Sequence, residues 1–190
     1  RFEQLSLSNV SAAMGIKFLQ KSLVAVVFAL VLILLYIALR FKNIGGLTGG
    51  MMAVLALVND LMVVFGTFVL LRTPLDGNFI AAMLTILGYS INDTVVVYDR
   101  IRENSHTMVK ATTEEIVNTS ISQTLSRSIN TSITTFIMVV MLYILGVASI
   151  RDFSLPLMAG LVCGAYSSIC IATELWYVMK VHLGKNKATK

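Results

Sequence analysis

The stretch Phe79–Tyr98, FIAAMLTILGYSINDTVVVY, decides the fold class of this chain. It is almost entirely apolar, and its only charged side chain is Asp93. A transmembrane helix needs about 20 consecutive, mostly apolar residues. The stretch therefore predicts a membrane-spanning helix with one carboxyl group inside it.

The composition of the whole chain agrees with that prediction. Of the 190 residues, 56% are hydrophobic and 13% are charged, and the net charge is +5, whereas a soluble domain carries about 25% charged residues. These values exclude a soluble globule and a disordered chain. The basic residues lie between apolar runs and form no patch, so we expect no nucleic-acid partner. We predict an all-α fold, a polytopic membrane helix bundle.

Five apolar runs reach the length needed to span a bilayer. The predicted spans are residues 22–40, 50–71, 79–98, 129–146 and 153–179. A Pro- and Gly-containing turn separates the second and third spans. The long polar connection before the fourth span contains a capping box formed by Thr112 and Glu115. It predicts an amphipathic helix over about 112–127 that lies on the membrane surface and can continue into the fourth span.

The loops also predict the orientation of the chain in the membrane. One side holds ten basic residues and the other holds five, and cytoplasmic loops are the ones enriched in Lys and Arg. The richer side holds Arg40, Lys42, Arg100, Arg102, Lys110, Arg127, Lys180, Lys185, Lys187 and Lys190. We therefore expect a multi-pass protein with residues 181–190 as a cytoplasmic tail and residues 1–21 outside, leading into the first span. An odd number of spans implies a longer parent chain with an earlier span or an export signal.

Two carboxyl groups cannot be placed in loops or at interfaces. From the helix rise, Asp93 lies about 21 Å and Asp60 about 18 Å below the outer face. Ionisable groups at such depth are functional candidates. Each follows an asparagine, Asn92 and Asn59, so the two carboxylates would share one polar cavity if their helices are neighbours.

Arg127 is the candidate cationic partner, near the inner edge of the fourth span. Its side chain can reach inward to a carboxylate or outward to the headgroups. It belongs to a polar stripe of Gln123, Arg127, Asn130 and Thr134, flanked by Thr131 and Thr135, which favours the inward orientation or a polar packing seam between helices. We expect the supporting polar cavity to consist of Asn59, Tyr89, Asn92, Asn130, Thr131 and Thr134.

A proton-binding pair follows from this placement. Burial disfavours the charged form of a carboxyl group, whereas a nearby arginine favours it. A carboxylate whose partner can approach and withdraw would bind and release a proton. We expect proton transfer at Asp93 with Arg127 as its partner, and we include Asp60 in the same set.

The remaining motifs predict packing and no catalytic chemistry. Gly160, Gly164 and Ser168 follow a four-residue spacing that lets helices approach closely. Cys163 and Cys170 are expected to be free thiols, and there is no Cys/His cluster. We therefore expect no metal, no cofactor and no enzymatic activity.

Several motifs resemble the SecF family of the SecDF protein-export complex. They are the run Ala82–Asn104, with Asn92-Asp93-Thr94; Thr124–Thr135, with Leu125-Ser126-Arg127; Tyr36–Phe41; and Gly164–Ser168. The resemblance covers about 24–177. Tyr98 and Ser128 stand where the family usually has Phe and Thr, and both changes are conservative.

The resemblance implies a fold and a function. The chain would be spans two to six of SecF, half of a transmembrane unit of the resistance-nodulation-division type, and residues 1–21 would include the tail of an extracytoplasmic domain. Such a protein resides in the bacterial cell membrane and works with SecD and the SecYEG translocon. It uses the proton-motive force to assist preprotein export, and its intramembrane Asp and Arg would be Asp93 and Arg127.

Three rival interpretations have weaker support. They are a small-molecule or lipid exporter of the same superfamily, a non-transporting scaffold, and an intramembrane aspartyl protease, for which no Gly-x-Gly-Asp motif exists here. The sequence leaves open whether the parent is a separate SecF or a fused SecDF, and whether the coupling ion is a proton or sodium.

Overall fold

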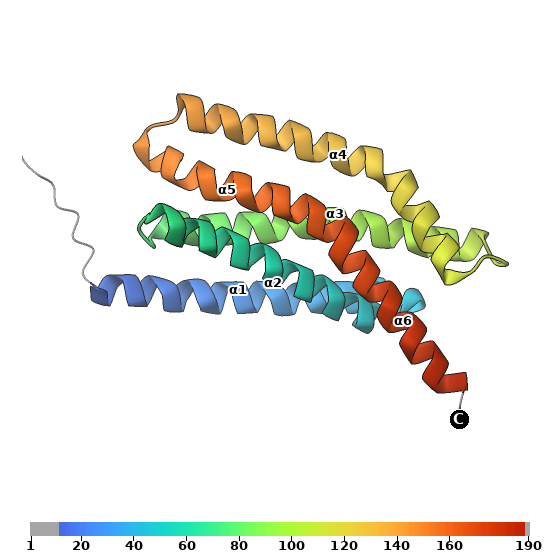
Figure 1. The fold of residues 1–190 in the computed structure, drawn as a ribbon. Coiled ribbons are helices and arrows are strands. Elements are labelled where there is room, and N and C mark those ends of the chain that lie inside the picture. Colours follow the sequence, from blue (N-terminus) through green and yellow to red (C-terminus); the bar gives the residue numbers. More distant parts are fainter. Residues whose placement is uncertain (1–11, 189–190) are drawn as a thin grey trace, which may run out of the picture.

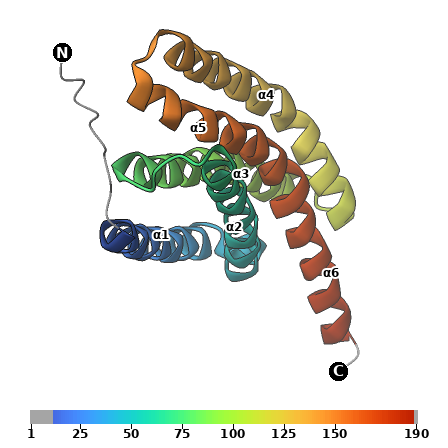
Figure 2. The ribbon, with the colours of Figure 1, turned by 60° about the vertical axis from the view of Figure 1, so that its left-hand side comes forward.

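The computed structural model describes residues 12–188, and every regular element in that range is a helix. The elements are α1 (Ala12–Arg40), the short 3₁₀ helix η1 (Lys42–Ile44), α2 (Gly46–Leu71), α3 (Gly77–Thr107), α4 (Thr113–Leu145), α5 (Ala148–Tyr166), the π-helical segment η2 (Ser167–Ala172) and α6 (Thr173–Ala188). The first five α-helices lie side by side, and α6 leaves the line of α5 (Figures 1 and 2). Helix α3 packs against every other α-helix, so it is the central element of the bundle.

The prediction of an all-α membrane bundle is confirmed. Within residues 12–188, five helical stretches are long and apolar enough to cross a membrane: Leu19–Arg40, Gly46–Leu71, Gly77–Thr107, Thr113–Leu145 and Ile150–His182. The helices extend beyond the predicted spans because a helix need not end where the apolar sequence ends. In particular, α1 begins ten residues before the predicted start at residue 22, α3 continues past Tyr98 to Thr107, and α6 continues to Ala188. The parts of the predicted terminal segments at 1–11 and 189–190 lie outside the described residues.

The capping box at the start of α4 is confirmed. The Thr112 hydroxyl accepts a hydrogen bond from the Glu115 amide at 3.2 Å, and the Glu115 carboxylate accepts one from the Thr112 amide at 2.8 Å. Two backbone donors at the helix start are satisfied in this way. From there α4 runs unbroken to Leu145. The predicted surface segment 112–127 and the fourth span are therefore one helix.

A tight turn joins α1 to α2. Gly45 has φ of +92°, a conformation that favours glycine. A Cβ atom on the next residue, Gly46, would lie 2.5 Å from the Ala38 carbonyl oxygen and 2.9 Å from the Phe41 carbonyl carbon. The glycine pair therefore allows α2 to begin directly against the end of α1.

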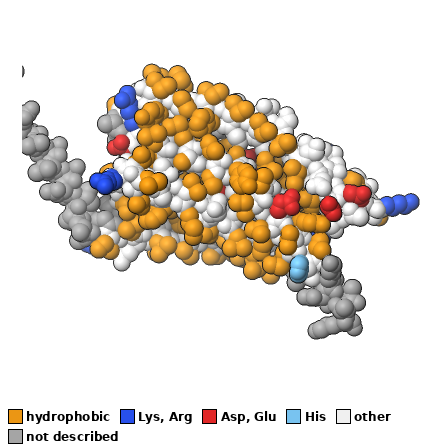
Figure 3. Space-filling view, in the orientation of Figure 1, with side chains coloured by type: hydrophobic (Ala, Val, Ile, Leu, Met, Phe, Trp, Pro, Cys, Tyr) orange, Lys and Arg blue, Asp and Glu red, His pale blue; other side chains and the backbone are white. Residues whose placement is uncertain are grey.

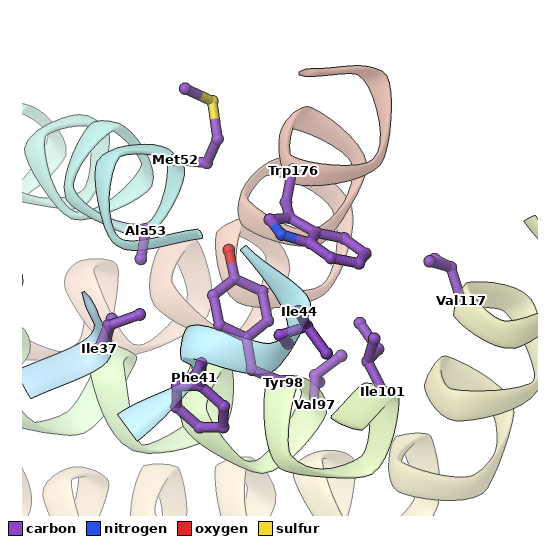
Figure 4. Packing of buried hydrophobic residues seen from close by; sticks show 10 residues of the cluster. All are labelled: Ile37, Phe41, Ile44, Met52, Ala53, Val97, Tyr98, Ile101, Val117 and Trp176. Atoms are coloured by element: carbon purple, nitrogen blue, oxygen red, sulfur yellow. The ribbon is translucent and has the colours of Figure 1, made fainter. Parts of the chain in front are cut away.

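Of the three apolar clusters among the described residues, two lie towards opposite ends of the bundle. One lies between α2, α3 and α5 and includes Val64, Phe68, Phe79, Ile86 and Leu161, with Phe68 and Phe79 in edge-to-face contact at 5.1 Å. The other surrounds the fully buried Tyr98 and Trp176 (Figure 4). The Tyr98 hydroxyl group contacts the carbonyl oxygens of Gly49 at 3.2 Å and Ala172 at 3.3 Å. This second cluster therefore joins α2, α3 and α6.

The outer surface is arranged as expected for a bilayer. Large apolar side chains are exposed along α1 and α4, among them Phe28, Leu39, Ile137 and Met138. In Figure 3, hydrophobic side chains cover the middle of the visible face, and the charged side chains gather towards its two ends. Lipid can cover such a band, whereas water would disfavour it.

Close packing of α5 depends on Gly160, which generates a prediction. A Cβ atom there would lie 2.6 Å from Val64 Cγ2 and 2.7 Å from Ile86 Cδ1, whereas one at Gly66 would meet nothing within 4 Å. We expect Gly160→Ala to lower the free energy of unfolding by about 1–3 kcal/mol through overpacking. Gly66→Ala should be neutral or stabilise by up to about 1 kcal/mol. Unfolding of the purified protein in detergent measures both, and equal stability of the two variants would contradict the packing.

Candidate functional site

Asp93 lies on the face of α3 that packs inside the bundle, and only 3% of this residue is exposed. The buried Oδ2 atom of its carboxyl group has no hydrogen-bond partner. The Ser128 hydroxyl oxygen on α4, 1% exposed, has no partner either. Apart from burial itself, Ser128 and Arg127 are the groups that influence the Asp93 carboxyl electrostatically. An unsatisfied buried polar atom is costly, and such atoms in native proteins need an explanation.

Arg127 does not form an ion pair with Asp93 or with any other described carboxylate. Its exposed side chain lines a pocket of about 540 Å³ at one end of the bundle, together with Arg40, Asp99, Arg100, Glu103 and Gln123. In that pocket Arg40 pairs with Asp99 at 3.2 Å and Arg100 with Glu103 at 2.6 Å. Arg127 therefore lines a pocket that contains two ion pairs, and it is also close enough to Asp93 to act on the charge of that carboxyl group.

A further polar contact lies beside Asp93 on the same pair of helices. The Tyr89 hydroxyl donates to the Ser132 hydroxyl oxygen at 2.9 Å. Asp93 and the Thr135 hydroxyl group are also close enough to act on the Tyr89 hydroxyl group. The structure thus brings Tyr89 and Asp93 from α3 together with Ser128, Ser132 and Thr135 from α4.

The facing residues of α4 differ from the stripe that the sequence suggested. Asn130 and Thr134 are exposed, and the Thr134 hydroxyl donates to the Asn130 carbonyl of its own helix at 2.9 Å. Thr131 likewise donates to the Arg127 carbonyl. The structure does not bring Asn130 and Thr134 to Asp93 within this chain.

The residues that sequence reasoning missed are the small hydroxyl side chains of α4. Ser120, Thr124 and Ser128 are buried against the bundle, and Ser132 is half-buried. They follow one another at intervals of four residues, which places them on one face of a helix. That regular spacing is present in the sequence, but the larger polar side chains of the neighbouring face give a stronger polar pattern.

Asp60 lies in a separate environment, at the junction of α2, α3 and α5. It is fully buried, and its carboxylate accepts hydrogen bonds from Ser90 Oγ at 2.6 Å and Ser167 Oγ at 2.8 Å. The Cys163 thiol donates to its other oxygen at 3.3 Å. No hydrogen-bond partner is common to Asp60 and Asp93 among the described residues. The two carboxyl groups therefore contact different sets of side chains, although their helices are neighbours.

The two asparagines that precede these carboxyl groups in the sequence also lie in different environments. Asn59 is half-buried and donates to Cys163 Sγ at 3.4 Å, so it belongs to the Asp60 environment. Asn92 is exposed and lines a groove between α1 and α3 with Tyr36 and Gly88. Of the two asparagines, only Asn59 therefore takes part in the hydrogen-bond network of the carboxyl group that follows it in the sequence.

The small residues of α5 and η2 bring this segment close to α3. A Cβ atom at Gly164 would lie 3.2 Å from Ser90 Cβ and 3.7 Å from an Asp60 carboxylate oxygen. Ser168 Oγ donates to the Ser90 carbonyl oxygen at 2.9 Å. The predicted packing face of Gly160, Gly164 and Ser168 therefore also borders the Asp60 environment.

The described residues contain no group of three or more His, Cys, Asp or Glu side chains placed to hold a metal ion. Cys163 and Cys170 are free thiols. The chemistry that the geometry offers is therefore that of isolated buried carboxyl groups, hydroxyl donors and one nearby guanidinium.

Comparison with known proteins adds independent information. Residues 1–182 match the family described as protein export membrane protein SecD/SecF, C-terminal. The chain is 41% identical to protein translocase subunit SecF of Alicyclobacillus acidocaldarius over 99% of its own length and 60% of that relative. It is 40% identical to protein translocase subunit SecDF of Thermus thermophilus, over 98% of this chain and 25% of that relative. The chain thus spans less than two thirds of the relatives it matches.

A solved structure shares the fold. The crystal structure of SecDF in a super-membrane-facing form superposes with a TM-score of 0.77 at 42% sequence identity, over 84% of this chain and 21% of that one. This likeness confirms the resemblance inferred from the motifs around Asp93 and Arg127. The chain therefore belongs to the SecD/SecF family of protein-export membrane proteins, on the SecF side of that family.

Proposed function

We propose that this chain is the membrane part of a proton-driven SecF subunit that assists the export of preproteins across the bacterial cell membrane. It would act with SecD beside the SecYEG translocon. The observation that carries the proposal is the buried, unpartnered carboxyl oxygen of Asp93 opposite the equally unpartnered hydroxyl of Ser128. The family relationship supplies the transport context.

The chemistry of these two groups suits a change of protonation state. A protonated Asp93 has one O–H donor, and a charged Asp93 only accepts hydrogen bonds. A serine hydroxyl can accept from the first and donate to the second. Ser128 can therefore serve either state of Asp93 by rotating its hydroxyl group.

Arg127 interacts differently with the protonated and the charged form of Asp93. A guanidinium carries five donors and no acceptor, so it stabilises only the charged carboxylate. In the present arrangement Arg127 is not paired with Asp93 and lies at the ion-paired pocket of Arg40, Asp99 and Glu103. We propose that Arg127 moves towards Asp93 when the proton leaves and returns to the pocket when a proton is bound. Alternation between two such arrangements is what couples proton movement to a conformational cycle.

The pocket at Arg127 also supports an orientation. Arg40, Arg100, Arg102 and Arg127 gather at the same end of the bundle, where Arg40 and Arg102 both pair with Asp99. Lys and Arg are enriched on the cytoplasmic side of membrane proteins. We propose that this end and the C-terminus face the cytoplasm, and that the pocket admits water from that side.

The first prediction concerns the carboxyl group itself. Asp93→Asn keeps the shape of the side chain but cannot exchange a proton. We expect proton-motive-force-stimulated preprotein translocation into inverted vesicles, measured with the full-length parent protein and SecD, to fall to the level seen with an uncoupler.

The matched control is Asp76→Asn at the start of α3, where asparagine replaces aspartate equally well as a helix cap. We expect this variant to retain stimulation. Full stimulation with Asp93→Asn would contradict the proposal and favour a scaffold. Proton-dependent efflux of a small molecule without any effect on preproteins would favour an exporter.

The second prediction concerns Arg127. Because the proposal needs a movable positive charge, Arg127→Gln should abolish the same stimulation, and Arg127→Lys should restore part of it. Lys110→Gln removes an exposed charge from the loop between α3 and α4 and should have no effect. If Arg127→Gln and Lys110→Gln behave alike, Arg127 is not the partner of Asp93.

A further inference from the structure

The second buried carboxyl group, Asp60, is bound in a way that differs from Asp93. Both of its oxygens are occupied: Oδ2 accepts from Ser90 and Ser167, and Oδ1 accepts from Cys163. All three donors are neutral and belong to α3, α5 and η2. No Lys or Arg among the described residues pairs with Asp60. The carboxyl group of Asp60 on α2 therefore connects three other segments of the bundle through hydrogen bonds.

One of these segments is the π-helical turn η2, Ser167–Ala172. A π-helical turn widens a helix locally, and such turns often coincide with kinks and functional positions. Figures 1 and 2 show that α6 leaves the direction of α5 at this place. Two hydrogen bonds from η2 end on the Asp60 environment, one from Ser167 to Asp60 and one from Ser168 to the Ser90 carbonyl. The bend is therefore held from inside the bundle by α2 and α3.

The other end of this connection is close to the proposed proton site. Ser90 precedes Asp93 by three residues on α3, which is slightly less than one helical turn. Helix α3 is continuous from Gly77 to Thr107, so Ser90 and Asp93 belong to one uninterrupted helix. A displacement of α3 at Asp93 therefore also displaces Ser90 and, through Asp60, the start of η2.

We propose that Asp60 is a positioning residue that fastens the bend between α5 and α6 to α3, so that movement of α3 at Asp93 is passed on to α6. The inference rests on the proposed function for its role in export, but the fastening itself can be tested independently. If Asp60 fastens the bend, the distance between α3 and α6 has one fixed value, whether Asp93 is protonated or charged.

Pulsed electron paramagnetic resonance measures the distance between α3 and α6. Spin labels are placed at His106 on α3 and at Val178 on α6, two exposed positions, in the full-length parent protein with SecD. Cys170→Ser and Cys163→Ser remove the native thiols, and serine at 163 keeps the donor to Asp60. In this background we expect one narrow distance distribution.

Two substitutions should loosen the junction. Asp60→Asn replaces one acceptor oxygen by an NH2 donor, and Ser167→Ala removes one donor with almost no change of shape. We expect both to broaden the distance distribution and to lower proton-motive-force-stimulated translocation together. Ser167→Thr, which keeps a hydroxyl donor and adds no thiol, should restore a narrow distribution at least in part.

The matched control is Ser154→Ala on α5. Ser154 is as completely buried as Ser167, but its hydroxyl donates only to the Ile150 carbonyl of its own helix. We expect it to leave both the distance distribution and translocation unchanged. If Ser167→Ala gives the same narrow distribution as Ser154→Ala, the proposal is overturned. It is also overturned if Asp60→Asn stops translocation with a narrow distribution while Ser167→Ala remains active, because Asp60 would then act through its own proton.

Asp93→Asn separates this inference from the proposed function. We expect it to stop stimulated translocation and to leave the distribution narrow, since the Asp60 junction is intact. If Asp93→Asn were active, the proposed function would fail, and the distances in Asp60→Asn and Ser167→Ala would still decide whether Asp60 fastens the bend.

Discussion

A carboxyl group inside an apolar helix bundle must obtain its hydrogen bonds from the protein, because lipid offers none. The packing around α3 meets this requirement at one carboxyl group and leaves it unmet at the other. Asp60 is surrounded by donors from three segments, whereas Asp93 Oδ2 has none. The two buried carboxyl groups therefore differ in whether the helices around them supply hydrogen-bond donors.

The small residues of the bundle make the satisfied environment possible. Gly164 leaves room for Ser90 and Asp60 to approach η2, and Gly160 brings α5 against Val64 and Ile86. Larger side chains at these positions would separate the helices and leave Asp60 exposed to unfavourable apolar surroundings. Close to Asp93 on α3, the polar groups that act on its carboxyl group are Ser128 and Arg127 of α4, and Tyr89 lies about one turn before it.

The fold and the candidate residues could be predicted from the sequence to different degrees. The depth of Asp60 and Asp93 follows from the helix rise alone, and the five apolar runs and the Thr112 capping box are explicit in the sequence. The direction in which each side chain points around its helix depends on tertiary packing, which a single sequence does not determine. The depth argument predicted one shared cavity, whereas in the structure Asp60 and Asp93 have no common hydrogen-bond partner among the described residues. For the same reason the polar stripe predicted Asn130 and Thr134 in the cavity, although Ser128 and Ser132 face α3. The π-helical turn had no sequence signal, because Ser167–Ala172 is compatible with an ordinary α-helix.

The unbroken course of α4 has a mechanical consequence. Its 33 residues give a rod of about 50 Å, whereas the hydrocarbon core is about 30 Å thick. A third or more of that length must therefore stand beyond the lipid or be taken up by tilt. Thr113 at the capped start of α4 lies about 22 Å along the helix from Ser128. A tilt of about 5° about Ser128 would therefore displace the Thr113 end by about 2 Å. The α5–α6 pair, by contrast, changes direction at η2, so α3 is packed against one continuous helix, α4, and one bent pair, α5 and α6 (Figure 1).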